Sequence, residues 1–453
     1  MNTSLRLLPV LILAITLCGC DAISHRADAD SNVRVVEAAF FEGGYGIHWH
    51  QKIAEEYSRA HKDEGVVVEL WGDPRMRDKV KPRILRGDPP DVMLDQYLPI
   101  WKMIAAGKLL PFNDVLDQPV NDSGELWRDQ FIPGTLDSFT SDGKCYGIPT
   151  SFGAWGCWYD AKLFREHGWT PPATWSEFTA VCAEIKAAGI APLAFQGKYP
   201  YYAWYSYISV AQRCGGLPLI NRMNALEPGA FSHPDAIAAA KLWQDLVRDY
   251  FQPGYEAMNH LESQLEFVNN KAAMIFCGVW LFNEMKESTP PDFEMRVFNV
   301  PAVEGGKGNP KLFNGLGMEQ MLVTSDGRYP EDAMDFARYM ISMQNGADMA
   351  SSIGVISPLK GGCPRETVGP PLQSVLDMID AAPGVFNVRL YDLLLEWREQ
   401  VAHIALASLM QGDITPEEFG RQLDEGLVRA QQDPDVIIPP FTPYDPASLG
   451  ETP

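Results

Sequence analysis

The 453-residue sequence lacks the patterns that mark several common kinds of function. Its eight cysteines form no Cys-x-x-Cys pair and no Cys/His spacing typical of zinc sites. A nucleophile elbow, a His-Glu-x-x-His pair and a glycine-rich phosphate loop are also missing from the sequence. We therefore predict a protein that is not an enzyme and that has no cofactor and no metal site.

Positive charge is scarce. The chain has 37 lysines and arginines against 59 aspartates and glutamates, which gives a formal net charge of -22. A surface this acidic repels phosphate backbones and anionic lipid headgroups. We therefore expect no nucleic-acid partner.

Long apolar runs are confined to the first twenty residues. A head with one positive side chain (1–6) precedes an apolar run (7–17) that is too short to span a bilayer, as in a secretory signal. The following Leu-Cys-Gly-Cys resembles a bacterial lipobox, which implies cleavage before Cys20 and a lipid on its sulfur. We expect a signal peptide at 1–19 and a lipid anchor with its tether at 20–32. The protein would then lie in the periplasm or at the cell surface, held to the membrane through the lipid alone.

The cysteines after Cys20 are scattered along the chain. In an oxidising compartment six cysteines allow up to three disulfides, and we expect at least one, with the pairing left open. The alternative is that they are buried, unpaired apolar side chains. They are Cys145, Cys157, Cys182, Cys214, Cys277 and Cys363.

Apolar segments suited to strands and helices alternate from the first strand onward. Strands are expected at 33–41, 66–71 and 91–94, with helices between them at 47–61 and 79–85. This alternation predicts parallel βαβ units and an α/β fold. Later strands are expected at 145–149, 273–277, 295–300 and 321–324, and later helices at 98–106, 175–188, 234–250, 261–269, 330–343, 374–411 and 416–432.

Three neighbouring segments carry the most specific pattern: Asp-Gly-Lys-Cys-Tyr-Gly-Ile-Pro (142–149), Cys-Trp-Tyr-Asp-Ala-Lys-Leu-Phe (157–164) and Trp-Thr-Pro-Pro-Ala-Thr-Trp-Ser-Glu-Phe (169–178). Pro149 is expected to end a strand where the chain crosses between lobes. The two prolines at 171–172 block a helix, and Thr174 or Ser176 can cap the helix that follows.

These segments resemble the sugar-specific solute-binding proteins of ABC importers, in the maltose-binding-protein-like group. Residues 270–280, 322–325, 330–336 and 354–358 resemble further segments of that family in the same order. The departures are Asp160, where the family has asparagine after Tyr159, and Asn270, where it has glycine. Within the group, Phe-Glu-Gly-Gly-Tyr-Gly (41–46) resembles the binders of N-acetylglucosamine and its short oligomers.

The resemblance implies an α/β, two-lobe periplasmic-binding-protein fold with a hinge between the lobes. Lobe 1 would hold 33–149 plus 297–346, and lobe 2 would hold 150–296 plus 347–453. It also implies the function: the lobes close on a small-molecule carbohydrate and deliver it to the membrane permease subunits of an ABC transporter.

A sugar site needs aromatic rings for the sugar faces and polar groups for the hydroxyls. The resemblance places Trp280 at the family's stacking position, and Gly278 beside it would leave room for ligand. Tyr202 and Trp204 belong to an aromatic cluster after Pro200, and Trp155 lies in a loop after the first crossover. Core packing is the alternative for each of these rings.

Polar candidates follow the ends of predicted strands, where open α/β sheets bind ligands. They are Glu42, Gly43, Gly44 and Tyr45 after the first strand, Asp95 and Gln96 after the third, and Glu319 before a later strand. A plain turn is the alternative for the glycine pair, and a helix cap is the alternative for Asp95.

A secreted glycoside hydrolase with an aromatic cleft is the alternative function. Its acid–base pair would have to come from neighbouring carboxylates such as Asp91/Asp95 or Glu417/Glu418, which more often lie on an exposed face. His48 and His50 are two residues apart and do not share a helix face, so they are poor metal ligands.

Overall fold

The computed structural model describes residues 33–43, 45–94, 98–120 and 124–451. Four predicted positions therefore lie outside the described residues: Cys20, Gly44, Asp95 and Gln96. From Arg34 onward the chain forms one compact unit.

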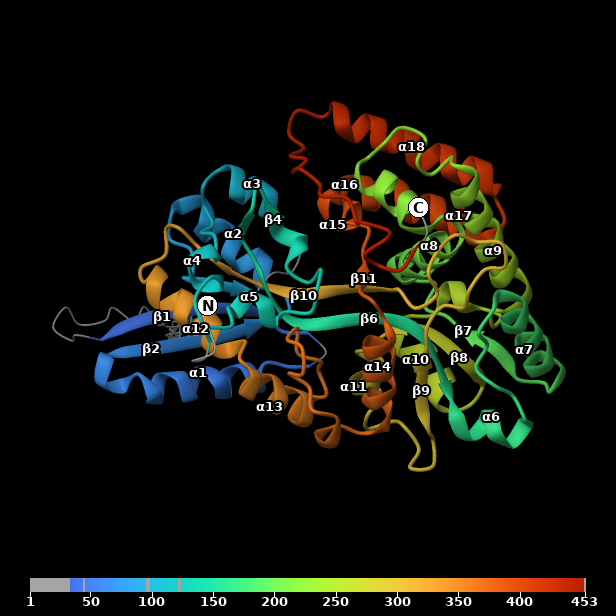
Figure 1. Cartoon of the computed structure of the whole chain (residues 1–453), viewed down its shortest axis with the longest axis horizontal. Helices are drawn as coiled ribbons and strands as arrows, with labels where there is room; N and C mark the ends of the chain where they lie inside the picture. The colour runs from blue at the N-terminus through green and yellow to red at the C-terminus, as the bar shows by residue number, and fades with distance from the viewer. Residues whose placement is uncertain (1–32, 44, 95–97, 121–123, 452–453) are drawn as a thin grey trace, which may run out of the picture. The chain divides into compact units, whose positions relative to one another are not determined.

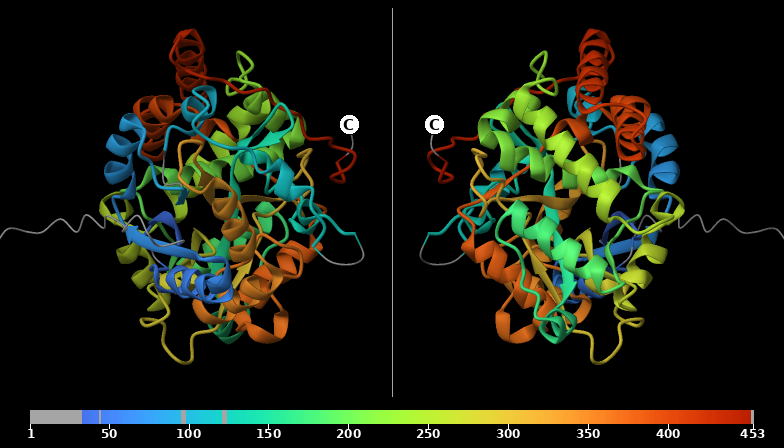
Figure 2. Two further views of the ribbon diagram at one scale, coloured as in Figure 1. Left: turned by 90° about the vertical axis from the view of Figure 1, so that its left-hand side faces the viewer. Right: turned by 90° about the vertical axis from the view of Figure 1, so that its right-hand side faces the viewer.

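The chain begins with the predicted parallel βαβ units. Strand β1 (Arg34–Phe41) is followed by α1 (His48–Ala60), β2 (Val66–Asp73), α2 (Met76–Arg86) and β3 (Val92–Leu94). Strand β1 pairs with both β2 and β3 in parallel. Val36, Ala38 and Phe40 are fully buried in β1, and helices pack against both faces of the sheet (Figures 1 and 2). The prediction of an α/β fold with parallel units is confirmed.

Two long antiparallel strands run through the middle of the sheet. These are β6 (Ile148–Asp160) and β10 (Phe313–Val323), drawn side by side across the centre of Figure 1. At one end β10 pairs with β3, and at the other β6 pairs with β8 (Ala272–Gly278). Among the described residues the order is β2-β1-β3-β10-β6-β8-β7, with β9 on β6 and β11 on β10. The remaining strands of this sheet are β7 (Ala191–Ala194), β9 (Met295–Phe298) and β11 (Val385–Phe386).

The prediction that Pro149 ends a strand is wrong. Strand β6 starts at Ile148 and continues through Pro149, which lies opposite Gln320 near the start of the strand. A proline is tolerated there because little of the ladder precedes it. Strand β10 begins at Phe313, well before residue 321, where the sequence predicted its start. The prediction missed the first part of the strand because Gly315 and Gly317 weaken the strand pattern there. A side chain at Gly317 would place its Cβ 2.5 Å from the Cβ of Pro149.

Helices surround the half of the sheet that contains β7, β8 and β9, which we call the far half (Figure 1). Helix α7 (Trp175–Ala187) begins with the predicted cap: the backbone N–H of Glu177 donates to Thr174, whose own N–H donates to the Glu177 carboxylate. Helix α8 (Pro200–Asn224) is broken at Gly216, where φ is 64°. Further helices here are α6 (Ala161–His167), α9 (Pro234–Tyr250), α10 (His260–Val268), α11 (Leu281–Glu284), α14 (Pro370–Ala381), α15 (Leu390–Leu393), α16 (Leu395–Trp397), α17 (His403–Gln411) and α18 (Pro416–Gln432).

The half that contains β1, β2 and β3, which we call the near half, carries the remaining helices and a small two-stranded sheet. The helices are α3 (Ile100–Ala105), α4 (Asn113–Leu116), α5 (Trp127–Gln130), α12 (Pro330–Met340) and α13 (Met343–Ile353). Strands β4 (Thr140–Ser141) and β5 (Lys144–Cys145) pair beside them. Short 3-10 turns lie at Lys62–Glu64, Asp137–Phe139, Tyr255–Ala257 and Arg365–Thr367, and Arg398–Ala402 forms a π-helical turn between α16 and α17.

The buried apolar side chains fall into separate groups that share the two long strands. Ile148 in β6 and Met321 in β10 pack with β1, α1 and α12, which we call the near core. Phe152 in β6 and Phe313 in β10 pack with β8, α8 and α9, which we call the far core. The boundary between the cores therefore falls within β6 and β10. The residue ranges predicted for the two lobes remain a prediction.

The expected disulfide is not formed: all six cysteines in the described part of the chain are free and buried. Each one packs as a small apolar side chain, as the alternative stated. Burial raises the pKa of the Cys214 thiol to about 12 and that of Cys363 to about 11, so neither is a reactive thiolate.

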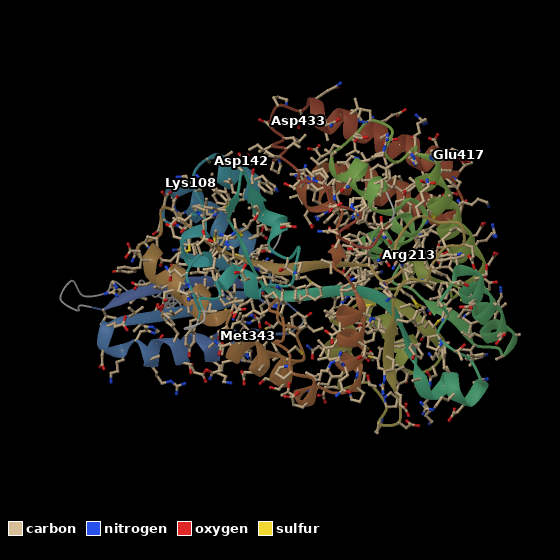
Figure 3. All side chains as sticks on the ribbon, in the orientation of Figure 1. Lys108, Asp142, Arg213, Met343, Glu417 and Asp433 are labelled. Atoms are coloured by element: carbon tan, nitrogen blue, oxygen red, sulfur yellow. The ribbon has the colours of Figure 1, made fainter. Side chains whose placement is uncertain are left out.

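The C-terminal tail after Gln432 is irregular, yet its end is anchored. Glu451 is buried, and its carboxylate accepts hydrogen bonds from Gln212 Nε2 and the Leu217 backbone N–H, each at 2.6 Å. Arg213, labelled in Figure 3, is fully buried beside this carboxylate. The tail therefore closes over the break in α8.

Candidate ligand-binding cavity

A cavity of about 930 Å³ lies among residues from both ends of the sheet. Its walls come from the end of β1 and the turn after it, from α3, from the middle of β6 and β10, and from α8, α10, α11 and the C-terminal helices. Asp433, labelled at the top of Figure 3, lines it just after α18. The carboxyl end of β1 and both crossing strands thus share one cavity, the place where open α/β sheets bind ligands.

Aromatic rings form the far wall. Trp155 lies 5.7 Å from Tyr202 and 6.0 Å from Trp280, measured between ring centroids. The Trp280 indole N–H donates to the Tyr202 hydroxyl at 3.2 Å, and the Trp155 indole N–H donates to Ser206 at 3.2 Å. Trp155 and Tyr202 are almost completely buried, whereas Trp280 is partly exposed. Trp280 is therefore the ring of the three with a face available to a ligand.

The sequence suggested that Gly278 leaves room for the ligand, but in the structure it leaves room for a neighbouring side chain. A Cβ added to Gly278 would overlap the six-membered ring of Trp280 itself. The glycine therefore lets the Trp280 ring pack against the end of β8, in the position from which it lines the cavity.

Two of the predicted contacts lie elsewhere. Trp204 is only 1% exposed and packs in the far core, stacked on Tyr391 at 5.5 Å and beside Trp397 at 5.6 Å. Helical spacing explains this, because on α8 the residues 201, 202 and 205 line the cavity while residue 204 faces inward. Glu42 is partly exposed but does not line the cavity, unlike its neighbours Gly43 and Tyr45.

Tyr45 belongs to the near wall. It follows β1 and reaches the cavity that Trp280 lines from the other side. Burial raises the pKa of the Tyr45 hydroxyl well above its usual value, and the negative charges of Glu319 and Glu284 raise it further. The phenol therefore stays neutral and can donate a hydrogen bond.

Glu319 lines the cavity from the middle of β10. Burial raises the pKa of its carboxyl group to about 7, because no charged partner offsets the loss of water. A carboxyl group of this kind can accept hydrogen bonds when ionised and can donate one when protonated.

Glu284 is a second carboxyl group in the cavity, and the sequence did not single it out. It lies on α11, four residues after Trp280, and accepts a hydrogen bond of 2.6 Å from Gln264 Nε2. Burial raises the pKa of Glu284, and the Gln264 hydrogen bond and the nearby His260 oppose that rise. Its helical spacing from Trp280 was the signal available in the sequence.

Sequence reasoning also missed rings on both sides of the cavity. On the near side, Trp101 of α3 lies 5.9 Å from Phe139, and both line the cavity. Helix α3 is short and apolar, so its sequence gives no sign that one residue faces a ligand. Other lining residues that the sequence did not single out include Phe41, His260, Asn314 and Met318, whereas Tyr201, Tyr205 and Tyr391 had been noted among the aromatic residues and also line the cavity.

In the described part of the chain, no group of three or more His, Cys, Asp or Glu side chains is arranged to hold a metal ion. His50 is buried against Phe40 and Trp49, with ring centroids 5.4 and 5.2 Å away. Over the same residues, no helix is both long enough and apolar enough to cross a membrane.

Comparisons with known proteins agree with this architecture. The sequence pattern of the bacterial extracellular solute-binding protein family matches residues 48–347. The diacetylchitobiose binding protein NgcE of Streptomyces coelicolor is 26% identical over 379 residues, which is 81% of this chain and 80% of that protein. The multiple sugar-binding protein of Streptococcus mutans is 24% identical over 71% of this chain and 74% of its own.

A solved structure of a chitin oligosaccharide binding protein superposes with a TM-score of 0.73 at 21% identity, covering 88% of this chain and all of that one. At that identity the likeness concerns the fold, which is the two-lobe α/β fold expected from the sequence. With a family pattern matching about two thirds of its length and the cavity placed between the two ends of its sheet, the chain belongs to the bacterial extracellular solute-binding protein family.

Proposed function

We propose that this protein captures a carbohydrate in the cavity, closes its two lobes on it and delivers it to the membrane permease of an ABC importer. The observation that carries the proposal is the composition of the cavity: partly exposed rings on both walls, with carboxyl groups and a neutral phenol between them. Rings cover the C–H faces of a sugar, and these polar groups satisfy its hydroxyls.

The proposed ligand is a short oligosaccharide or an N-acetylglucosamine-type sugar. A volume of about 930 Å³ is near the top of the roughly 300–1,000 Å³ range of small-molecule sites, which favours more than one sugar ring. The names of the relatives, a diacetylchitobiose binding protein and a chitin oligosaccharide binding protein, support the N-acetylglucosamine type.

We further propose that the two lobes meet within β6 and β10, where the near and far cores divide. Leu312 and Phe313 pack in the far core and Met321 in the near core, so this division moves the limit predicted at 297 into β10. Met349 packs in the near core, so the limit predicted at 346 moves beyond it. Lobe closure would then bend the two long strands.

The protein is proposed to work in the periplasm or at the cell surface, anchored through a lipid on Cys20. The family's extracellular character supports the location, and the lipobox-like sequence supports the anchor. Mass spectrometry of the N-terminal peptide from the native host tests the anchor directly, since a lipidated Cys20 carries the mass of its acyl chains.

The hydrolase alternative gains nothing from the carboxylate pairs that suggested it. Asp91 is buried and accepts hydrogen bonds from the backbone N–H groups of Glu37 and Tyr329, each at 2.9 Å. Glu418 is paired with Arg421 on the surface of α18. Asp91 therefore joins separate segments of the fold, Glu418 makes a surface pair within one helix, and neither lines the cavity.

A thermal-shift screen over neutral and N-acetylated mono- and oligosaccharides tests the proposal. A sugar at 100 times its dissociation constant adds about 2.7 kcal/mol to the free energy of unfolding, enough to raise the melting temperature measurably. Chromatography of each sugar after incubation should return it intact. If no sugar shifts the melting temperature, carbohydrate capture is wrong; if a sugar is cleaved, the hydrolase alternative replaces it.

A further inference from the structure

Glu319 has a backbone conformation that strands avoid. Its φ is +52°, in the left-handed region. Four non-glycine residues of the described chain have positive φ, and the other three lie in turns (Asp142, Leu226 and Asn270). A glutamate held this way within a strand stores strain, and strain of this kind gathers at functional sites.

Two buried side chains hold this conformation in place. The Thr150 hydroxyl donates to the backbone carbonyl of Glu319 at 3.0 Å, and Gln320 Nε2 donates to the carbonyl of Gly317 at 2.9 Å. On either side the ladder between β6 and β10 is regular, with Met318 opposite Ser151 and Gln320 opposite Pro149. The irregularity is therefore one turned residue in an otherwise paired strand, with no residue inserted into the ladder.

The turned residue lies where the two cores divide. Before it, Phe313 of β10 packs in the far core; after it, Met321 packs in the near core. A rotation about the backbone bonds of Glu319, together with bending of the paired strand β6, would therefore move one core relative to the other. Few residues absorb the φ and ψ changes of a hinge, and they lie at such crossings.

The side chain of the same residue lines the cavity. Three other polar or charged residues line the same cavity: Tyr45 from the turn after β1, Glu284 from α11 and Lys102 from α3. His260 also lines it and lies near Glu284. Within the described residues the Glu319 carboxylate has no hydrogen bond and no ion pair. The group is thus available to a ligand.

We propose that Glu319 is both a specificity-determining contact and the hinge residue. Its carboxylate accepts a hydrogen bond from a hydroxyl group of the bound sugar, and this contact holds the turned backbone in the closed arrangement of the lobes. The proposal rests on the carbohydrate-binding function proposed above. It adds that the sugar must present a hydroxyl donor at this point and that closure depends on this contact.

Two substitutions with matched chemistry test it. Glu319→Gln removes the charge at the crossing, whereas Glu284→Gln makes the same change in the same cavity on a helix away from it. Calorimetry with N,N′-diacetylchitobiose, or the sugar with the largest thermal shift, gives the affinity. Small-angle scattering with and without saturating sugar gives the closure, as a fall in the radius of gyration.

We expect Glu319→Gln to weaken binding about tenfold or more and to show a smaller fall in the radius of gyration even at saturation. Glu284→Gln should close fully once saturated. Glu319→Gly should keep the wild-type melting temperature, because glycine adopts this φ readily, yet lose ligand-dependent closure. Wild-type affinity should rise between pH 6 and 8 as the carboxyl group ionises, and Glu319→Gln should flatten that profile.

The result that overturns the inference is a Glu319→Gln protein that closes as fully as wild type at saturation, or one that keeps the wild-type pH profile. A wild-type protein that binds none of the sugars has a different meaning. It refutes the carbohydrate function first, and the hinge proposal with it.

Discussion

Trp280 and Trp204 are both aromatic candidates in the sequence, and the structure places Trp280 at the cavity and Trp204 in the far core. Replacing Trp280 by alanine removes a ring that is partly exposed at the cavity. We expect sugar binding to weaken by about 1–3 kcal/mol, roughly tenfold to a hundredfold, as for buried aromatic anchors at interfaces. The fold should survive, since water already reaches this ring.

Replacing Trp204 by alanine empties a site in the far core. Trp204 is 1% exposed and surrounded by the rings of Tyr391, Trp397 and Phe231 within 6 Å. Large-to-small changes of this kind cost about 3–5 kcal/mol of stability. We expect a clear fall in the urea midpoint, with near-wild-type affinity in the protein that remains folded.

Urea unfolding and calorimetry on the two variants separate the roles. The expected pattern is crossed: affinity lost without stability in Trp280→Ala, and stability lost without affinity in Trp204→Ala. If Trp280→Ala unfolds while its folded fraction binds sugar normally, Trp280 is a core residue and the cavity has been placed wrongly.

Four further outcomes are expected. Gly278→Ala should weaken sugar binding about as much as Trp280→Ala, because the new methyl group displaces the indole; calorimetry measures this, and unchanged affinity contradicts it. Burial lowers the pKa of His50 from 6.5 to about 4, so the unfolded chain binds the proton of this histidine more tightly than the folded chain does. The contribution of His50 to the free energy of unfolding should be complete above pH 6.5. It should fall by up to about 1.4 kcal/mol per pH unit as the pH is lowered toward 4. Urea midpoints at several pH values should show this slope in wild type and lose part of it in His50→Leu. Cys20→Ser should leave the membrane fraction of the native host or stay unprocessed, which immunoblots of the fractions detect. Glu451→Ala should lower the melting temperature, since it removes a buried carboxylate that accepts hydrogen bonds from Gln212 Nε2 and the Leu217 N–H and that lies near the buried guanidinium of Arg213.

Regular, locally determined features could be read from the sequence. The helix 416–432 was predicted with the bounds that α18 has, because Thr415 caps it, Pro416 opens it and its apolar residues recur at helical spacing. The parallel pairing of β1 with β2 and β3 followed from the alternation of short apolar runs with helices. In both cases the secondary structure that the local sequence favours is the one that the tertiary structure also needs.

The two crossing strands could not be read in full, because tertiary contacts determine them. Gly153, Gly156, Gly315 and Gly317 lower strand propensity, yet Gly156 and Gly317 are needed where a neighbouring chain passes close. The missed lining residues have the same origin. Nothing local distinguishes Trp101, which faces the cavity, from Trp204, which does not, since the choice depends on which elements the fold brings opposite them.

The buried cysteines make this protein suited to site-selective labelling. All six in the described chain are at most 7% exposed, so a thiol-reactive dye has little access to them in the folded state. With Cys18 and Cys20 removed along with the first twenty residues, one cysteine introduced at an exposed position such as Lys144 would be the preferred site of attachment. A dye placed there would change its emission if its surroundings change when the lobes close, which would turn the protein into an optical reporter of its own ligand.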